Sequence, residues 1–189
     1  MIRAYEHAAE VVSGIEPAQL RLPTPCAKYD VASLIDHVVG AGNRGVSIAQ
    51  GDPVGGDEFP HIELADAPEE LRQTGKAAEA AWGDDQKLGA SITMPWGEIY
   101  DGYTAVNMFL TELATHTWDL AAATRQLSKL DPALAPSALD GARSMLKPEY
   151  RNMMEEGSPF GSEINPPKDA NDWERLAAFT GRAPRPVLG

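Results

Sequence analysis

The chain has 189 residues, of which 43% are hydrophobic and 23% charged, as expected for a globular protein with one sizeable core. Its 28 acidic residues outnumber its 16 basic ones, and the formal net charge of −12 argues against a nucleic-acid partner. Cys26 is the only cysteine, which excludes an intrachain disulfide and a zinc site made of several cysteines.

The first residues, MIRAYEHAAEVV, carry acids and a histidine where a signal peptide would have a continuous apolar run. No stretch approaches the ~20 apolar residues of a membrane helix. We therefore expect a soluble protein of a reducing compartment, the cytoplasm, with no membrane partner.

Apolar spacing predicts an amphipathic helix over residues 2–13 that ends near Gly14. Three prolines make residues 16–30 irregular. Asp30 is a good N-cap for a second helix with a clear apolar stripe, which runs to about Ala49. The first two helices therefore lie on either side of a proline-rich loop.

A Gly/Pro/acid-rich loop at residues 50–68 is long enough to be a crossover between distant elements. Alternation of apolar and polar residues around a Pro-Trp-Gly turn predicts a short extended segment or loose hairpin at residues 90–105. Residues 157–167 form a Gly/Pro-rich passage. Helical spacing predicts four more helices, at residues 68–83, 104–126, 136–145 and 169–181.

These elements predict an all-α fold. Four main helices with a long connection between the second and third indicate a four-helix bundle with a crossover, not a simple up-down bundle. We expect one domain over residues 1–189, with a bundle core at 1–130 and a C-terminal helical extension at 131–189.

Residues 111–124, TELATHTWDLAAAT, place polar groups in the middle of the longest predicted helix. At about 100° per residue, Glu112 and His116 lie roughly 40° apart beside its apolar face, with Asp119 about one turn further on. His37 lies at the edge of the second helix's stripe, so packing of the two helices can bring it close. Two readings stay open: a Zn²⁺-type site with an open ligand position, or an ordinary Glu112–His116 pair beside a core-edge histidine.

Two motifs, RLPTPCAKYDVASLIDHVVG at 21–40 and ELATHTWDLAAAT at 112–124, resemble the DinB-like metal-binding superfamily. Within it, they are most similar to the actinobacterial branch related to the mycothiol-dependent maleylpyruvate isomerase N-terminal domain. Residues 160–184 resemble the C-terminal segment of the stand-alone members of that branch. The likeness covers nearly the whole chain and implies a four-helix bundle with a long crossover, in agreement with the apolar pattern.

The resemblance also implies the metal ligands, a His on the second helix and a Glu-x-x-x-His pair on a later long helix. The matching positions are His37, Glu112 and His116, with water or a thiol as fourth ligand. Zn²⁺ is the expected ion and Ni²⁺ an alternative. Tyr29 stands where the family usually has Trp, which we expect to matter little for the metal. The isomerase has a separate C-terminal domain that completes its active site, so we do not expect this chain to isomerise maleylpyruvate.

The resemblance implies a metal-dependent, thiol-using enzyme of S-transferase or isomerase type, acting on a small electrophilic substrate. A bound metal would activate a low-molecular-weight thiol such as mycothiol, so the catalytic group would be the metal-bound thiol or water. Two alternatives remain, a metal-dependent hydrolase and a non-catalytic metal-binding or dimerising bundle. The sequence is compatible with both a monomer and a homodimer.

Two charged residues are candidates for supporting roles. Arg44 lies seven residues after His37 and could hold a substrate carboxylate, although such an arginine is more often solvated. Asp119 could orient a metal-bound imidazole, or make an ordinary hydrogen bond. The remaining chemically distinctive residues are expected to have no function: Cys26 as a buried loop anchor, His7 on an exposed helix face, His61 in a loop, and Trp96 and Trp118 in packing.

Overall fold

The computed structural model describes residues 1–52, 59–148, 151 and 160–186. Parts of the predicted crossover (53–58) and of the Gly/Pro-rich passage (157–159) lie outside the described residues. The elements in chain order are α1 (Ile2–Ser13), η1 (Pro17–Gln19), α2 (Val31–Gln50), α3 (Ala67–Trp82), α4 (Asp85–Leu88), β1 (Ser91–Thr93), β2 (Ile99–Asp101), α5 (Gly102–Ala123), η2 (Leu127–Lys129), α6 (Ala135–Met145) and α7 (Asp172–Phe179). The prediction of an all-α fold is confirmed.

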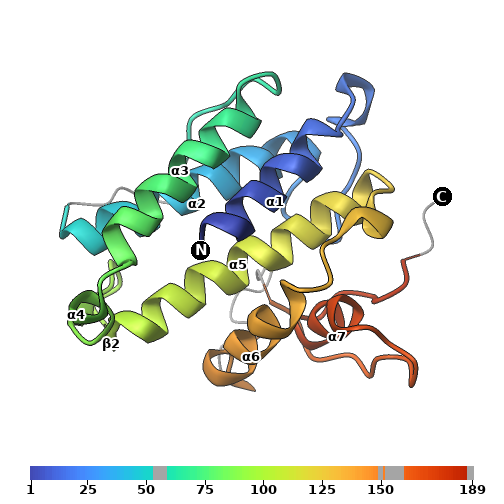
Figure 1. Cartoon of the computed structure of the whole chain (residues 1–189). Helices are drawn as coiled ribbons and strands as arrows, with labels where there is room; N and C mark the ends of the chain where they lie inside the picture. Colours follow the sequence, from blue (N-terminus) through green and yellow to red (C-terminus); the bar gives the residue numbers. More distant parts are fainter. Residues whose placement is uncertain (53–58, 149–150, 152–159, 187–189) are drawn as a thin grey trace.

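Helices α1, α2, α3 and α5 form a four-helix bundle (Figure 1). Both α1 and α2 pack against α3 and α5, so α1 lies diagonally opposite α2, and α3 lies diagonally opposite α5. The neighbouring helices α2 and α3 run in the same direction (Figure 1), so the chain must return along the bundle between them, which requires the long connection that the sequence predicts. The predicted crossover bundle is therefore confirmed.

Local signals explain where α2 begins and ends. Asp30 accepts a hydrogen bond from the backbone N–H of Ser33 at 2.9 Å, which satisfies a free donor of the first turn. Gly51 ends the helix with a φ of 78°, a conformation that costs glycine little. The apolar stripe between them joins the core through Val31, Leu34, Ile35, Val38 and Val39.

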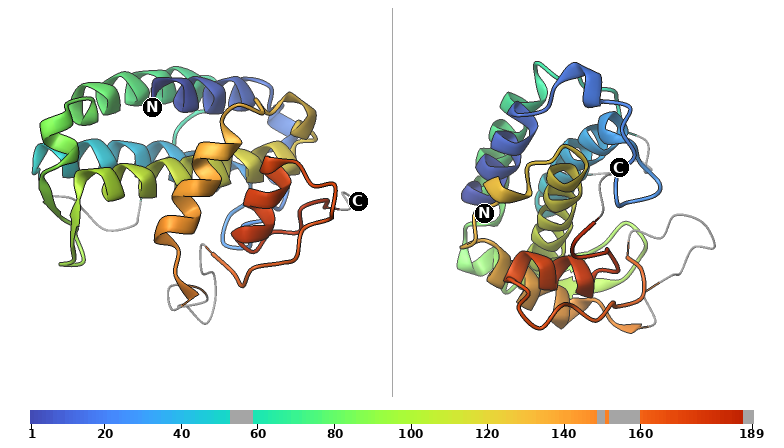
Figure 2. Two further views of the ribbon diagram at one scale, coloured as in Figure 1. Left: turned by 60° about the horizontal axis from the view of Figure 1, so that its bottom comes forward. Right: turned by 90° about the vertical axis from the view of Figure 1, so that its right-hand side faces the viewer.

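Helix α5 is buried nearly all round in its second half. Residues 113–124 are all buried, including the polar side chains of Thr115, His116, Thr117 and Asp119. The bundle covers one side of α5, and α6 and α7 cross its other side (Figure 2). Polar groups on this helix therefore lie inside protein on every side and need protein partners.

The predicted hairpin exists as β1 and β2, which pair antiparallel with Ile92 opposite Tyr100. Trp96, at the turn between them, is 55% exposed, so the expectation that it packs is wrong. Trp118 is buried in the core, as expected. Within the described residues, no helix combines the length and the apolar character that crossing a membrane requires.

The predicted helix end at Gln126 is three residues too late, because α5 ends at Ala123. Arg125 adopts a φ of 61°, which turns the chain out of the helix. The Gln126 side chain then donates to the backbone oxygen of Val11 at 2.9 Å and ties this turn to α1. A long-range contact thus stabilises the turn that follows the helix.

Candidate metal centre

His37 and Glu112 meet where α2 packs against α5. The Nε2 atom of His37 lies 2.9 Å from Oε1 of Glu112, within hydrogen-bond distance. On the other side of the ring, the Tyr29 hydroxyl lies 3.2 Å from His37 Nδ1, and the two rings stack with centroids 4.7 Å apart. Both nitrogens of His37 are therefore held by side-chain partners.

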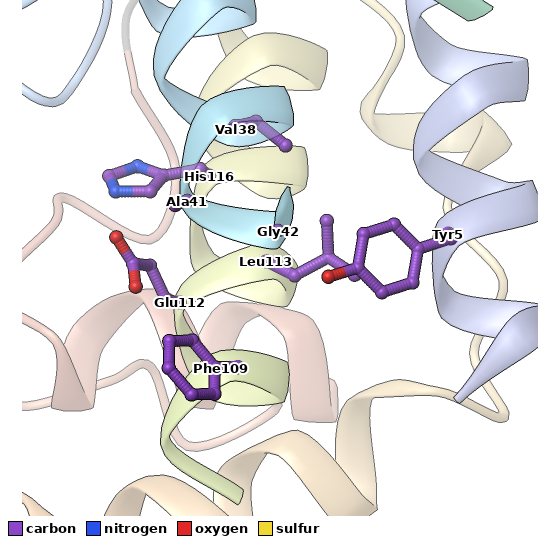
Figure 3. Close-up of a pocket in the computed structure, with 8 residues that line it drawn as sticks. All are labelled: Tyr5, Val38, Ala41, Gly42, Phe109, Glu112, Leu113 and His116. Atoms are coloured by element: carbon purple, nitrogen blue, oxygen red, sulfur yellow. The ribbon is translucent and has the colours of Figure 1, made fainter. Parts of the chain in front are cut away.

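His116 lies one turn after Glu112 on α5, and the two side chains point to the same side of the bundle, away from Tyr5 (Figure 3). His116 is 0% exposed, and its Nδ1 atom lies 3.0 Å from Oδ2 of Asp119. Its Nε2 atom is buried and has no hydrogen-bond partner among the described residues. A buried ring nitrogen without a partner costs about 1–3 kcal/mol, so this atom needs an explanation.

The structure brings the three predicted ligands together. One ligand atom each of His37, Glu112 and His116 can be chosen so that all lie within 4.8 Å of one another. The two imidazole rings are nearly perpendicular, at 86°, with centroids 5.0 Å apart. Two imidazole nitrogens and one carboxylate form a donor set that Zn²⁺ binds with a further position open. A divalent ion fits this set and would give His116 Nε2 its missing partner.

Charges around the site keep both carboxyl groups ionised. Burial alone would raise the pKa of Glu112, but the hydrogen bond to His37 and the proximity of His37, His116 and Arg44 lower it below its ordinary value. Burial would likewise raise the pKa of Asp119, and the neighbouring Arg182 guanidinium and the His116 hydrogen bond lower it. An ionised carboxylate can only accept hydrogen bonds, so Asp119 requires a hydrogen on Nδ1 of His116.

A second group of donors shares His116. The ligand atoms of Cys26, His116 and Asp119 also lie within 4.8 Å of one another, a proximity that the sequence did not reveal. Both Asp119 oxygens, however, already accept bonds from Arg182, at 3.0 and 3.1 Å. Burial raises the pKa of the Cys26 thiol, and the nearby guanidinium offsets this only in part. A protonated thiol and an engaged carboxylate make this group the poorer metal site.

The candidate site is closed on one side and open on the other. The side chain of His116 is 1% exposed, whereas those of His37 and Glu112 are 15% and 27% exposed. Phe59 lies beside the open side, with its ring centroid 5.7 Å from that of His37, and the Arg44 guanidinium lies 4.8 Å from the Phe59 centroid. Solvent can therefore reach the triad at His37 and Glu112.

A small cavity of about 10 Å³ lies on the inner side of the triad, room for roughly one water molecule. It is lined by Tyr5, Val38, Ala41, Gly42, Phe109, Glu112, Leu113 and His116 (Figure 3). This space is too small for an organic molecule.

Other predicted positions have mixed outcomes. Cys26 is a buried loop residue, as expected. His61 is exposed, and its Nδ1 lies 3.1 Å from Asp36. The expected exposure of His7 is wrong, because its residue is 5% exposed and its Nε2 accepts the backbone N–H of Asp131 at 3.2 Å. The C-terminal extension covers this face of α1, which the helical pattern alone does not show.

The sequence prediction did not identify two residues that support the site, Tyr29 and Arg182. Tyr29 was expected to matter little, yet it contacts His37 through both its hydroxyl and its ring. Arg182 carries no motif, and its contact with Asp119 joins residues 63 positions apart in sequence. The only sequence signal for Arg182 is that it lies in the tail that resembles the family's C-terminal segment.

Comparisons with known proteins identify the family of the chain. Two uncharacterized proteins of Mycobacterium tuberculosis, from strains CDC 1551 / Oshkosh and ATCC 25618 / H37Rv, are each 34% identical over 187 residues. The aligned part is 97% of this chain and 96% of each relative. No solved structure gives a significant match. The family model described as the mycothiol maleylpyruvate isomerase N-terminal domain matches residues 3–121, and the chain therefore belongs to this DinB-like, mycothiol-related family.

Proposed function

We propose that this protein is a metal-dependent enzyme of S-transferase or isomerase type that uses a low-molecular-weight thiol such as mycothiol. His37, Glu112 and His116 would hold the ion, with Zn²⁺ as the first candidate and Ni²⁺ as the second. The observation that carries the proposal is the buried Nε2 of His116, which lies beside the other two ligands and has no hydrogen-bond partner in the part of the chain that the structure describes. Family membership supports the choice of a thiol as co-substrate.

The residues around the triad have defined tasks on this proposal. When bound, the ion supplies positive charge that lowers the pKa of a thiol entering its open position and so favours the thiolate. Tyr29 and Asp119 hold the two imidazoles by their Nδ1 atoms, which leaves both Nε2 atoms as ligands. Arg44, whose positive charge acts on Glu112, is suited to binding an anionic group of the thiol or the electrophile.

The chain's own thiol is a poor candidate for the nucleophile. Cys26 is buried, and burial raises its pKa, so the thiolate is disfavoured. This favours a thiol that enters from solvent and reaches the site on the side where His37 and Glu112 are partly exposed. An enzyme that depends on a free thiol works in a reducing compartment, which we take to be the cytoplasm.

The first test is the metal content per chain of untagged protein, measured by mass spectrometry. We expect about one zinc or nickel per chain in the wild type and little in His116→Ala. His61→Ala is the matched control, because His61 is an exposed histidine of the crossover. Little metal in the wild type, even after incubation with zinc, would refute the metal centre.

The second test addresses the chemistry. Zinc-loaded protein is incubated with a panel of electrophiles, with and without mycothiol and with and without enzyme. Both the consumption of thiol and the conversion of the electrophile are followed, because an isomerase returns its thiol unchanged. We expect thiol-dependent turnover that His116→Ala abolishes and His61→Ala retains. Turnover of an ester or amide without any thiol would favour the hydrolase instead. Absence of thiol-dependent conversion of every electrophile, in both the isolated and the zinc-reconstituted protein, would refute the thiol-dependent reaction.

A further inference from the structure

Arg182 reaches the candidate metal centre from outside the part of the chain that the family model matches. It follows α7 in the C-terminal extension, and its residue is 5% exposed. Its Nε donates to Oδ1 of Asp119 at 3.1 Å, and its Nη2 donates to Oδ2 at 3.0 Å. A bidentate pair of this kind fixes both the position and the rotation of the carboxylate.

The backbone around Arg182 is itself held in place. Its N–H donates to the oxygen of Ala177 at 2.8 Å, and its Nη1 donates to the oxygen of Thr180 at 2.8 Å. Gly181 makes the turn with a φ of 87°, and a Cβ at this position would lie 2.6 Å from the Cα of Gly161. The guanidinium is thus presented to Asp119 by a turn with little freedom to move.

Asp119 passes this restraint to His116. Both oxygens of Asp119 accept hydrogens from Arg182, and Oδ2 also lies 3.0 Å from Nδ1 of His116. Because a carboxylate has no hydrogen to donate, the ring must carry its hydrogen on Nδ1. In a neutral ring the lone pair then lies on Nε2, which has no hydrogen-bond partner among the described residues.

Stability alone does not account for this arrangement. A buried ion pair often stabilises a protein no better than apolar side chains of similar volume would. Here the series of hydrogen bonds runs from Thr180 through Arg182 and Asp119 to His116. It ends at Nε2, which is without a partner in the described part of the chain. An arrangement that only stabilised the core would not leave its last member unsatisfied.

We propose that the C-terminal extension completes the metal centre, with Arg182 as a positioning residue that acts through Asp119 on His116. The inference rests on the proposed metal centre and deepens it. It makes the region after the family-matched residues part of the site, although none of the three proposed ligands belongs to that region.

The test measures zinc affinity by competition with a chromogenic chelator, using full-length protein whose folding is checked by circular dichroism. Removing a group that orients a metal ligand typically weakens binding 10- to 100-fold. We expect a loss in this range for Arg182→Gln and a smaller loss for Arg182→Lys, which keeps the charge. Arg175→Gln is the matched control, because Arg175 also belongs to the extension but pairs with Asp172 at the surface. It should bind zinc as the wild type does.

A double-mutant cycle shows whether Arg182 acts through Asp119. We expect Asp119→Asn to weaken zinc binding, and Arg182→Gln to add little further loss in the Asp119→Asn background. Should Arg182→Gln fail to fold, Arg182→Lys is used in the cycle instead. A purely structural arginine would lower the melting temperature and leave zinc affinity unchanged.

The outcomes separate the inference from the proposed function. Wild-type affinity in both Arg182 variants would overturn the inference and leave the metal centre standing. Full additivity of the Arg182 and Asp119 losses would also overturn it, because the two residues would then act independently. Absence of zinc binding by the wild type would remove both the inference and the metal centre.

Discussion

Replacing Glu112 with Gln separates metal binding from folding. The amide has nearly the size of the carboxylate and can still hydrogen-bond to His37, but it is a much poorer ligand for a divalent ion. In protein treated with a chelator, the variant loses only the ionic part of the contact between residue 112 and His37. The two side chains of this contact, His37 and Glu112, are 15% and 27% exposed. We expect that loss to be about 1 kcal/mol or less.

The effect of metal should be several times larger. Zinc at about 100 times its dissociation constant stabilises a native protein with one site by about 2.7 kcal/mol. For a chain of 189 residues this corresponds to a rise in melting temperature of about 5–10 °C. The wild type should show this rise, and Glu112→Gln should show little of it while keeping nearly the wild-type melting temperature in chelator.

The assay is thermal unfolding followed by circular dichroism, in chelator and in excess zinc. Glu69→Gln is the control, because it removes an exposed carboxylate of α3 whose contacts are with Arg72 and Gln73 of the same helix. An equal rise in Glu112→Gln and in the wild type would show that Glu112 is not a ligand. No rise in the wild type would refute the metal centre itself.

Three further predictions concern the residues that support the site. Tyr29→Phe keeps the ring stacked on His37 but removes the hydroxyl, and chelator competition should show about tenfold weaker zinc binding. In Gly40→Ala the new Cβ would lie 2.2 Å from the Phe59 ring, so Phe59 must move. Because the Phe59 ring lies against the ring of His37, zinc should then be lost to a chelator faster. The melting temperature should change little, because the gain of about 1 kcal/mol in helix propensity from Gly to Ala offsets the cost of moving Phe59. Asp30→Ala should cost about 1 kcal/mol near neutral pH in urea unfolding. The hydrogen bonds from Ser33 lower the pKa of Asp30 from 3.8, so its contribution is present above about pH 4. The difference between variant and wild type should therefore shrink as the pH falls below that value.

Most of the bundle was predictable because its signals are local. The apolar stripe and the Asp30 cap define the start of α2 without reference to any other element. Glu112 and His116 share a face of α5 by spacing alone, since four residues make about one turn. The sequence therefore reveals which residues face the core side of each helix.

Long-range contacts were not predictable in the same way. His7 looked exposed because the pattern of α1 reports only its packing in the bundle, whereas the N–H of Asp131 and the ring of Trp173 cover it from the extension. The proximity of Cys26 to His116 likewise depends on how the proline-rich loop folds back over α5. No periodicity in the sequence encodes either contact.

The two imidazoles of the candidate site differ in how they are supported, and the difference bears on the direction of ligand entry. His116 is enclosed, and its partner Asp119 is held by the extension, so this ligand is fixed from behind. His37 is partly exposed and is held by Tyr29, from the loop before α2. A thiol would therefore enter beside His37, where Phe59 gives an apolar surface and Arg44 a positive charge. On the proposed function, this open side selects the substrate, while the closed side fixes the geometry of the ligands.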